Sequence, residues 1–201
     1  MIPPKPTLIV VAGPNGAGKS TFTRVTSEAL RVPVIDPDLE ARKLQRENPE
    51  GAAIAGGKQA ILRARAYLTN NQSFAVETTL SGNTYLRMMV EAKTRGWQIN
   101  LIYVGVDNAI TCIERVAQRV VTGGHNVPQE DIRRRYTRSL ANLLVALQHA
   151  DNASIFDNST LVGYQKLLTI ENGEVIERAS ELPEWLTEPT SKESGILTDK
   201  D

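Results

Sequence analysis

The sequence GPNGAGKST, residues 13–21, constrains the fold more than any other stretch of the chain. It lies between the apolar run TLIVV and the segment FTRVTSEAL, so we expect a strand before it and a helix after it. It satisfies the pattern G-x-x-x-x-G-K-[ST], in which backbone N–H groups and the first turn of a helix surround phosphate oxygens. The stretch therefore predicts a phosphate-binding loop at a strand–helix junction.

Two side chains of this loop have expected chemical roles of their own. Lys19 is expected to reach the β- and γ-phosphates of ATP, and the hydroxyl of Ser20 is expected to ligate Mg²⁺. ATP and Mg²⁺ are therefore the predicted cofactors. The predicted ATP-binding residues are Gly13, Pro14, Asn15, Gly16, Ala17, Gly18, Lys19, Ser20 and Thr21.

The rest of the chain alternates short apolar runs with longer amphipathic ones, which predicts a sheet of mainly parallel strands joined by helices. Strands are expected at Thr7–Ala12, Pro33–Ile35, Ser73–Glu77, Gln98–Val106, Ala153–Asp157 and Lys166–Glu171. Helices are expected at Lys19–Leu30, Asp38–Glu47, Ala52–Asn70, Gly82–Arg95, Asn108–Val121 and Gln129–Ala150. Beyond Leu182 the sequence is polar and aperiodic, so we expect one domain over 1–182 and a flexible tail over 183–201.

Composition narrows the class of protein. Lys plus Arg and Asp plus Glu both number 23, so bulk charge gives no support to a nucleic-acid-binding protein. Cys112 is the single cysteine, which excludes an internal disulfide and fits a reducing compartment. No apolar stretch is long enough for a membrane span, and the start MIPPKP lacks the pattern of a signal peptide. We therefore expect a cytoplasmic protein.

Two other classes of nucleotide-binding protein fit the sequence poorly. The stretch TLSGN at 79–83 is similar to the signature of transporter ATPases, but Asn83 stands where that signature continues with Gly-Gln. The strand LIYVGVDN also ends without the Asp-Glu pair that activates water in those proteins. A GTPase would carry an N-K-x-D motif, which this chain does not contain.

A kinase needs an acid to position the acceptor hydroxyl and take its proton, and VIDPD supplies two candidates. Asp36 and Asp38 follow the short strand after the phosphate loop, at the sheet edge where ligands bind in α/β proteins. Either Asp38 acts on an acceptor, or it only caps the following helix.

The strand FAVETTLSG offers a third acid at the same edge. Glu77 is expected to bind Mg²⁺ through water or to orient the acceptor; the alternative is a plain acid at a strand end. Thr78 and Thr79 would project close to the phosphate loop.

A kinase also needs a mobile, arginine-bearing lid to neutralise the transferring phosphoryl group, and residues 115–138 fit one. Arg115 and Arg119 share a helical face, and Gly123–Gly124 then interrupts the helix. Further arginines follow at 133, 134, 135 and 138. The alternative is that these arginines only form a solvated helix face.

Six stretches occur in order between Pro6 and Gly173: GPNGAGKST, VIDPD, SFAVETTLSG, ERVAQRVVTGGHNVP, RRRYTRSLANL and FDNS. Together they resemble the zeta toxin family of P-loop kinases, especially its short bacterial chromosomal members. The resemblance implies that the protein phosphorylates a hydroxyl of UDP-N-acetylglucosamine with ATP and Mg²⁺, which poisons peptidoglycan precursor synthesis. It also implies a small antitoxin that obstructs the nucleotide site. We expect a three-layer P-loop kinase fold with a parallel sheet ordered 2-3-1-4-5.

The resemblance also implies residue roles. Asp38 would be the base on the acceptor hydroxyl, and Arg115 would be a phosphate-clamping arginine. The second such arginine of the family falls near GGHNVP, so its role passes to His125, Arg119 or Arg134. The helix GGKQAILRARAY has no counterpart of the family's substrate-binding glutamate, a departure that bears on the sugar nucleotide more than on phosphoryl transfer.

Three functions stay open at this point. The first is a kinase acting on a UDP-amino sugar as a toxin, and the second is a kinase for another small molecule or an RNA 5′-end. The third is a nucleotide-dependent binding module with slow ATP hydrolysis, which would have no need of an acid such as Asp38. We expect a monomer whose partners are a sugar nucleotide and a small antitoxin, with neither membrane nor nucleic acid among them.

Overall fold

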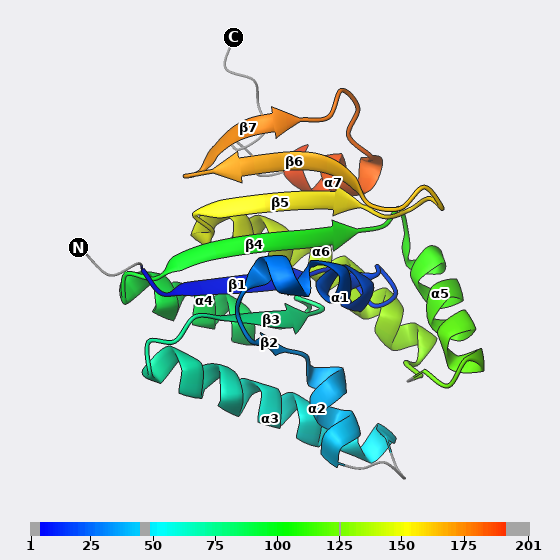
Figure 1. Ribbon diagram of the computed structural model, residues 1–201. Helices are drawn as coiled ribbons and strands as arrows, with labels where there is room; N and C mark the ends of the chain where they lie inside the picture. The colour runs from blue at the N-terminus through cyan, green and yellow to red at the C-terminus, as the bar shows by residue number, and fades with distance from the viewer. Residues whose placement is uncertain (1–4, 45–48, 125, 192–201) are drawn as a thin grey trace.

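The computed structural model describes residues 5–44, 49–124 and 126–191 of the chain (Figure 1). In chain order the elements are β1 (Thr7–Ala12), α1 (Lys19–Leu30), β2 (Val34–Ile35), α2 (Pro37–Leu44), α3 (Pro49–Thr69), β3 (Phe74–Thr78), α4 (Thr84–Thr94), β4 (Gln98–Gly105), α5 (Ala109–Val121), α6 (Gln129–His149), β5 (Asn152–Asp157), β6 (Gln165–Glu171), β7 (Glu174–Arg178) and α7 (Glu184–Ser191). Every expected strand and helix is present, with equal or slightly shifted ends. The expected end of the second helix, Glu47, lies outside the described residues.

The strands form one sheet in the order β2-β3-β1-β4-β5-β6-β7. Strands β1 to β5 all pair in parallel, which confirms the predicted core order 2-3-1-4-5. Strand β6 pairs antiparallel with β5 and confirms the sixth strand. Because the core strands are parallel, their carboxyl ends lie at one edge, and the segments that follow β1, β2, β3 and β4 meet there.

Strand β7 was not expected from the sequence. All its residues are exposed, so the strand lacks the alternation of buried and exposed side chains that would have predicted it. Its signal was the pair Asn172–Gly173, which forms the two-residue turn between β6 and β7 with φ angles of 53° and 83°. Positive φ at both turn residues is the reason why Asn-Gly is typical of such hairpins.

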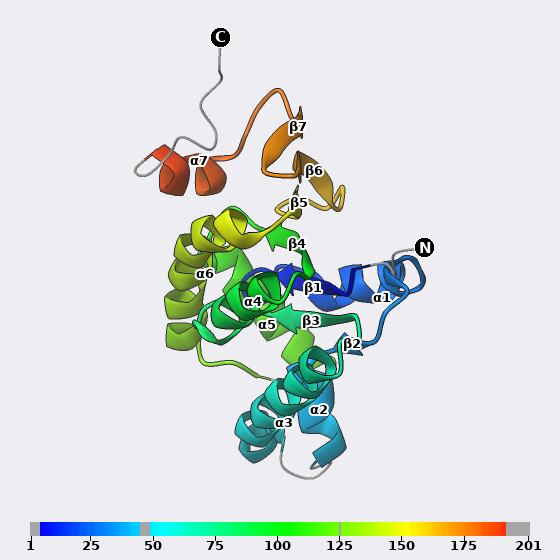
Figure 2. The same ribbon diagram turned by 90° about the vertical axis from the view of Figure 1, so that its left-hand side faces the viewer.

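Helices cover both faces of the sheet, which makes three layers as predicted. Helices α4 and α6 lie on one face and α1 lies on the other (Figure 2). The larger core cluster includes Met89 of α4, Leu101 of β4 and Leu143 of α6, and a smaller cluster on the α1 face packs Val11 against Leu30. Within the described residues, no helix is both long and apolar enough to cross a membrane.

The segment that was expected to be a loose tail contains helix α7, so this prediction is wrong for residues 184–191. Trp185 and Leu186 are 4% and 1% exposed and belong to the main core cluster. The Trp185 ring lies 6.1 Å from that of Tyr103, between ring centroids. Two adjacent buried residues make no helical period, which explains why the sequence pattern missed this helix. Residues 192–201 of the expected tail lie outside the described residues.

Candidate active site

The phosphate loop joins β1 to α1 and takes a shape that requires glycine at two positions. Gly13 has a φ of 145°, and a Cβ atom there would collide with the carbonyl oxygen of Val104. Gly18 has a φ of 99°, and a Cβ atom there would lie 2.5 Å from Nδ2 of Asn158. Since L side chains avoid both of these backbone conformations, the loop can curl in this way only with glycine.

Two side chains from the segment after β5 donate hydrogen bonds to backbone carbonyls of the loop. Asn158 Nδ2 donates to the carbonyl oxygen of Ala17 at 2.8 Å, and the Tyr164 hydroxyl donates to that of Gly18 at 2.7 Å. Among the described residues, no side chain caps the first turn of α1. The amides at the start of α1 are therefore available to an anion, as phosphate binding requires.

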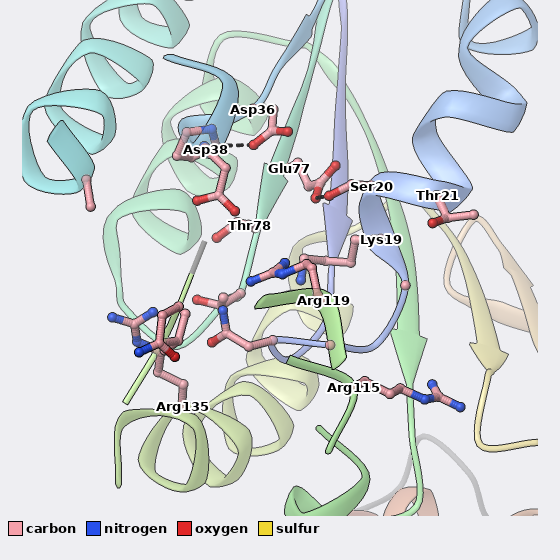
Figure 3. Close-up of a pocket in the computed structure, with 18 of the residues that line it drawn as sticks. Lys19, Ser20, Thr21, Asp36, Asp38, Glu77, Thr78, Arg115, Arg119 and Arg135 are labelled. Atoms are coloured by element: carbon pink, nitrogen blue, oxygen red, sulfur yellow. Dashed lines mark hydrogen bonds between the residues drawn. The ribbon is translucent and has the colours of Figure 1, made fainter. Parts of the chain in front are cut away.

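A cleft of about 640 Å³ opens beside the loop, at the carboxyl edge of the sheet (Figure 3). The residues expected from the sequence that line it are Asn15, Gly16, Gly18, Lys19, Ser20, Thr21, Asp36, Asp38, Glu77, Thr78, Thr79, Arg115 and Arg119. Gly13, Pro14 and Ala17 are buried on the inner side of the loop. The cleft thus brings together the phosphate loop, all three expected acids and two of the expected arginines.

Glu77, at the end of β3, is 6% exposed and lies against α1. Ser20 Oγ donates to its Oε1 at 2.5 Å, and Thr23 Oγ1 donates to its Oε2 at 2.8 Å. The carboxylate therefore contacts the same hydroxyl that is expected to ligate Mg²⁺. These contacts favour a role beside the phosphates over that of a plain acid at a strand end.

The two acids of VIDPD have different environments. The backbone N–H of Asp38 donates to Asp36 Oδ1 at 2.8 Å, so Asp36 caps the N-terminus of α2 and Pro37 occupies the first helical position. The alternative in which Asp38 serves as the cap is therefore wrong. The side chain of Asp38 instead lines the cleft, near Thr78 (Figure 3).

The surroundings of Asp36 in the folded protein destabilise its ionised form. Burial of its carboxyl group and, to a smaller extent, the negative charge of Glu77 raise the pKa of Asp36 to about 6. Burial lowers the pKa of Lys19, and the neighbouring charges of Glu77 and Asp38 oppose this effect. The acids at this edge of the sheet therefore favour the charged form of the lysine that is expected to bind phosphates.

Helix α2, which carries Asp38, is fixed against α3. Glu40 is 6% exposed and pairs with Arg63 of α3 and with Lys43, the latter at 3.0 Å. A Cβ atom on Gly56 of α3 would lie 2.5 Å from the backbone nitrogen of Ala41, so the two helices touch through their backbones. This packing holds the start of α2 at the edge of the cleft.

The two arginines of α5 point in different directions. Arg119 extends toward Lys19, whereas Arg115 extends away from it (Figure 3). A terminal nitrogen of Arg115 donates to the carbonyl oxygen of Ser159 at 3.1 Å. Gly124 folds back onto this helix, with its N–H donating to the Arg119 carbonyl at 2.9 Å. In this arrangement Arg119, rather than Arg115, approaches the expected position of the γ-phosphate.

The other expected lid residues are placed as follows. Arg134 pairs with Asp131 at 2.7 Å, and its side chain is 54% exposed and lies outside the cleft lining. Arg135, another arginine of the expected lid, lines the cleft instead. A signal was present, because Arg135 lies three residues after buried Ile132 and therefore on the inner side of α6. His125 lies outside the described residues.

The remaining cleft residues that sequence reasoning missed are Pro37, Ala53, Asn126, Val127 and Pro128. None of these side chains is charged, so no chemical pattern drew attention to them. They come from the start of α2, from α3 and from the segment before α6, which meet only in the folded chain.

The residues present fit Mg²⁺ as a partner of bound phosphates. Among the described residues, no group of three His, Cys, Asp or Glu side chains could hold a metal ion by itself. Ser20 and Glu77 nevertheless offer adjacent oxygen donors beside the phosphate loop. Mg²⁺ in kinase sites typically takes one or two protein oxygens together with substrate phosphates and water, which this pair matches.

Comparison with known proteins places the chain in a family. A family model described as an AAA domain matches residues 8–143. An uncharacterized protein of Haemophilus influenzae is 34% identical over 128 residues, which is 64% of this chain and 91% of that protein. The range matched by the family model includes the phosphate loop, the three acids and both arginines of α5.

Solved structures share the fold at low identity. A candidate kinase of Chloroflexus aurantiacus has a TM-score of 0.51 at 21% identity, over 64% of this chain and 75% of its own. The AvrRxo1-ORF1:-ORF2 complex with ATP has a TM-score of 0.69 at 14% identity, over 85% of this chain and 60% of that chain. The PezAT chromosomal toxin–antitoxin system of Streptococcus pneumoniae has a TM-score of 0.57 at 17% identity, over 76% of this chain and 68% of that chain. The chain therefore belongs to the AAA domain family, and its fold is that of P-loop kinases.

Proposed function

We propose that the protein is an ATP-dependent kinase that transfers the γ-phosphoryl group to a hydroxyl of a small acceptor. The observation that carries this proposal is that Asp36 caps α2 and leaves the side chain of Asp38 to line the cleft beside the phosphate loop. A protein that only binds or hydrolyses nucleotide needs no second acid at this position. A kinase needs one to accept the proton of the acceptor hydroxyl.

In the proposed reaction, the loop amides and Lys19 hold the β- and γ-phosphates of ATP. The acceptor hydroxyl gives its proton to Asp38 while its oxygen forms a bond to the γ-phosphorus, and the bond from that phosphorus to the ADP oxygen breaks. Arg119, which extends toward Lys19, would neutralise charge that spreads over the transferring group. Ser20 and Glu77 would hold Mg²⁺, which would supply positive charge to offset the negative charge of the phosphates.

For the acceptor we propose a UDP-amino sugar, with UDP-N-acetylglucosamine as the leading candidate. The proposal rests on the resemblance to zeta toxins, and the lining of the cleft supports it chemically. Arg135 and Asn126 line the same cleft as Asp38 and supply a cation and an amide for the diphosphate of such an acceptor. An RNA 5′-end or another small molecule with a hydroxyl is the alternative acceptor.

We further propose that the protein acts as a toxin and binds a small antitoxin. Two of the structures that share its fold contain a partner protein or come from a toxin–antitoxin system, which supports a partner here. Expression of the wild-type chain alone in bacteria should arrest growth, and expression of an Asp38→Asn variant should not. Equal growth with both would contradict the toxin proposal and leave the kinase proposal intact.

The test of the kinase is incubation with γ-labelled ATP and a panel of UDP-sugars, nucleosides, antibiotics and RNA 5′-ends. We expect label to move to a UDP-amino sugar with the wild-type chain and not with Asp38→Asn. Transfer to another member of the panel would keep the kinase and replace the acceptor. Labelled inorganic phosphate as the only product, unchanged in Asp38→Asn, would contradict the kinase and favour the binding module.

A further inference from the structure

The C-terminal helix α7 reaches the edge of the sheet where the cleft opens. Trp185 lies in its first turn, and a Cβ atom on Gly105, the last residue of β4, would collide with the indole ring. The indole Nε1 donates to Asp157 Oδ1 at 2.9 Å. Trp185 therefore contacts the last residues of both β4 and β5, the strands whose following segments border the ATP site.

Asp157 is a carboxylate that relies on neutral donors. It is 7% exposed, and its hydrogen bonds come from Trp185 Nε1, from Ser159 Oγ at 2.6 Å and from the Ser159 backbone N–H at 3.2 Å. No Lys or Arg of the described residues forms an ion pair with it. Because a buried carboxylate depends on its hydrogen bonds, loss of the indole donor should move the carboxylate and with it Ser159.

Ser159 connects this carboxylate to the proposed ATP site. Its Oγ accepts from the backbone N–H of Asp107 at 2.9 Å, and its carbonyl oxygen accepts from Arg115 at 3.1 Å. The preceding residue, Asn158, donates to the carbonyl oxygen of Ala17 in the phosphate loop. One short segment thus joins the phosphate loop, the start of α5 and the carboxylate that α7 contacts.

We propose that Trp185 is a positioning residue for ATP binding, which acts through Asp157 and Ser159 on Arg115; the inference rests on the proposed ATP site. Helix α7 is then a part of the nucleotide site, although none of its described side chains lines the cleft. Arg115 extends away from Lys19 (Figure 3), so we expect it to contact a part of the nucleotide other than the γ-phosphate. Because Arg115 donates to the Ser159 carbonyl oxygen, the position of Ser159 determines where that guanidinium lies.

The test compares two tryptophans with the same burial. Trp185→Phe keeps a ring in place and removes the indole donor. Trp97→Phe is the matched control, because Trp97 is 3% exposed, belongs to the same core cluster, and its indole nitrogen has no hydrogen-bond partner among the described residues. For each variant, isothermal titration calorimetry gives the Kd for Mg²⁺–ATP without acceptor, and thermal unfolding gives the Tm.

We expect Trp185→Phe to raise the Kd for ATP about three- to tenfold, less than a lost hydrogen bond to a charged group would cost directly, because the effect reaches ATP only through Ser159 and Arg115. Trp97→Phe should lower the Tm and leave the Kd unchanged. In an Arg115→Ala background, Trp185→Phe should raise the Kd no further, because its effect passes through that arginine. If Trp185→Phe does not fold, Ser159→Ala breaks the same link at the other end and should raise the Kd in the same way.

Two results would overturn the inference alone. One is an unchanged Kd in Trp185→Phe or Ser159→Ala while the wild type binds ATP, which would make α7 a purely structural element. The other is a full, additive effect of Trp185→Phe in the Arg115→Ala background. A wild-type chain that binds no ATP would overturn the proposed function as well, so the two failures can be told apart.

Discussion

Replacement of Asp36 by asparagine should stabilise the folded protein at neutral pH. Asparagine is as good an N-cap as aspartate, so the hydrogen bond to the backbone N–H of Asp38 is kept. What changes is the charge of the side chain, which is unfavourable in the wild type because burial and the neighbouring Glu77 raise the pKa of Asp36 from 3.8 to about 6. The substitution removes this unfavourable charge without removing the cap.

The magnitude follows from the difference between the folded and unfolded pKa values. At about 1.4 kcal/mol for each pKa unit, ionised Asp36 lowers the free energy of unfolding by about 2 to 3 kcal/mol. Between about pH 4 and 6 the unfolded chain loses this proton before the folded chain does. The contribution of Asp36 to stability therefore falls as the pH rises through this window, and it stays low above about pH 6.

Urea unfolding of both proteins between pH 4 and 8 measures this effect. The Asp36→Asn variant should match the wild type near pH 4 and exceed it by about 2 to 3 kcal/mol at pH 7. The control Asp36→Ala removes the same charge together with the cap, so its gain at pH 7 should be smaller by about 1 kcal/mol. A difference between Asp36→Asn and wild type that does not change with pH, or a loss of stability at pH 7, would refute the reasoning.

Three further substitutions test the proposed reaction. Asp38→Asn should lower kcat by about 10²- to 10⁴-fold while the Kd for ATP stays unchanged, as an ADP-release assay and calorimetry would show. If Asp36→Asn gave the larger loss of kcat, the roles of the two acids would be reversed. Lys19→Ala should abolish measurable transfer of label from ATP, and wild-type turnover would remove the phosphate loop from the mechanism. Arg119→Ala should lower kcat by about 10³-fold or more with little change in ATP affinity, whereas Arg134→Ala should retain wild-type kcat. Equal, small effects of the two would mean that the arginines form a solvated face.

The parallel core of the fold was predictable because its signals are local. A phosphate loop requires a strand before it and a helix after it, and buried parallel strands give short continuous apolar runs such as TLIVV. Strand β7 and helix α7 lack such runs. One is exposed throughout, and in the part of the other whose burial is described the buried residues are the adjacent pair Trp185 and Leu186.

The candidate site was predictable in its acids and less so in its arginines. Asp38 follows β2 and Glu77 lies near the end of β3, and strand order alone brings them to one edge of the sheet. Whether Arg134 or Arg135 lines the cleft depends on the rotation of α6 about its axis. The pattern of charges in the sequence does not determine that rotation. Contacts such as that of Tyr164 with Gly18 join residues distant in the sequence, and no local pattern indicates them.

The hydrogen bonds of the phosphate loop have a consequence for the heat of nucleotide binding. Lys19 Nζ donates to the carbonyl oxygen of Pro14 at 2.9 Å, and Ser20 Oγ donates to Glu77. Phosphates compete with the Pro14 carbonyl for the Lys19 ammonium, so at this side chain binding replaces an existing bond, whereas the uncapped amides at the start of α1 form new bonds to phosphate. Lys19 therefore contributes little to the enthalpy measured by calorimetry, and a favourable enthalpy of nucleotide binding should come mainly from the backbone amides.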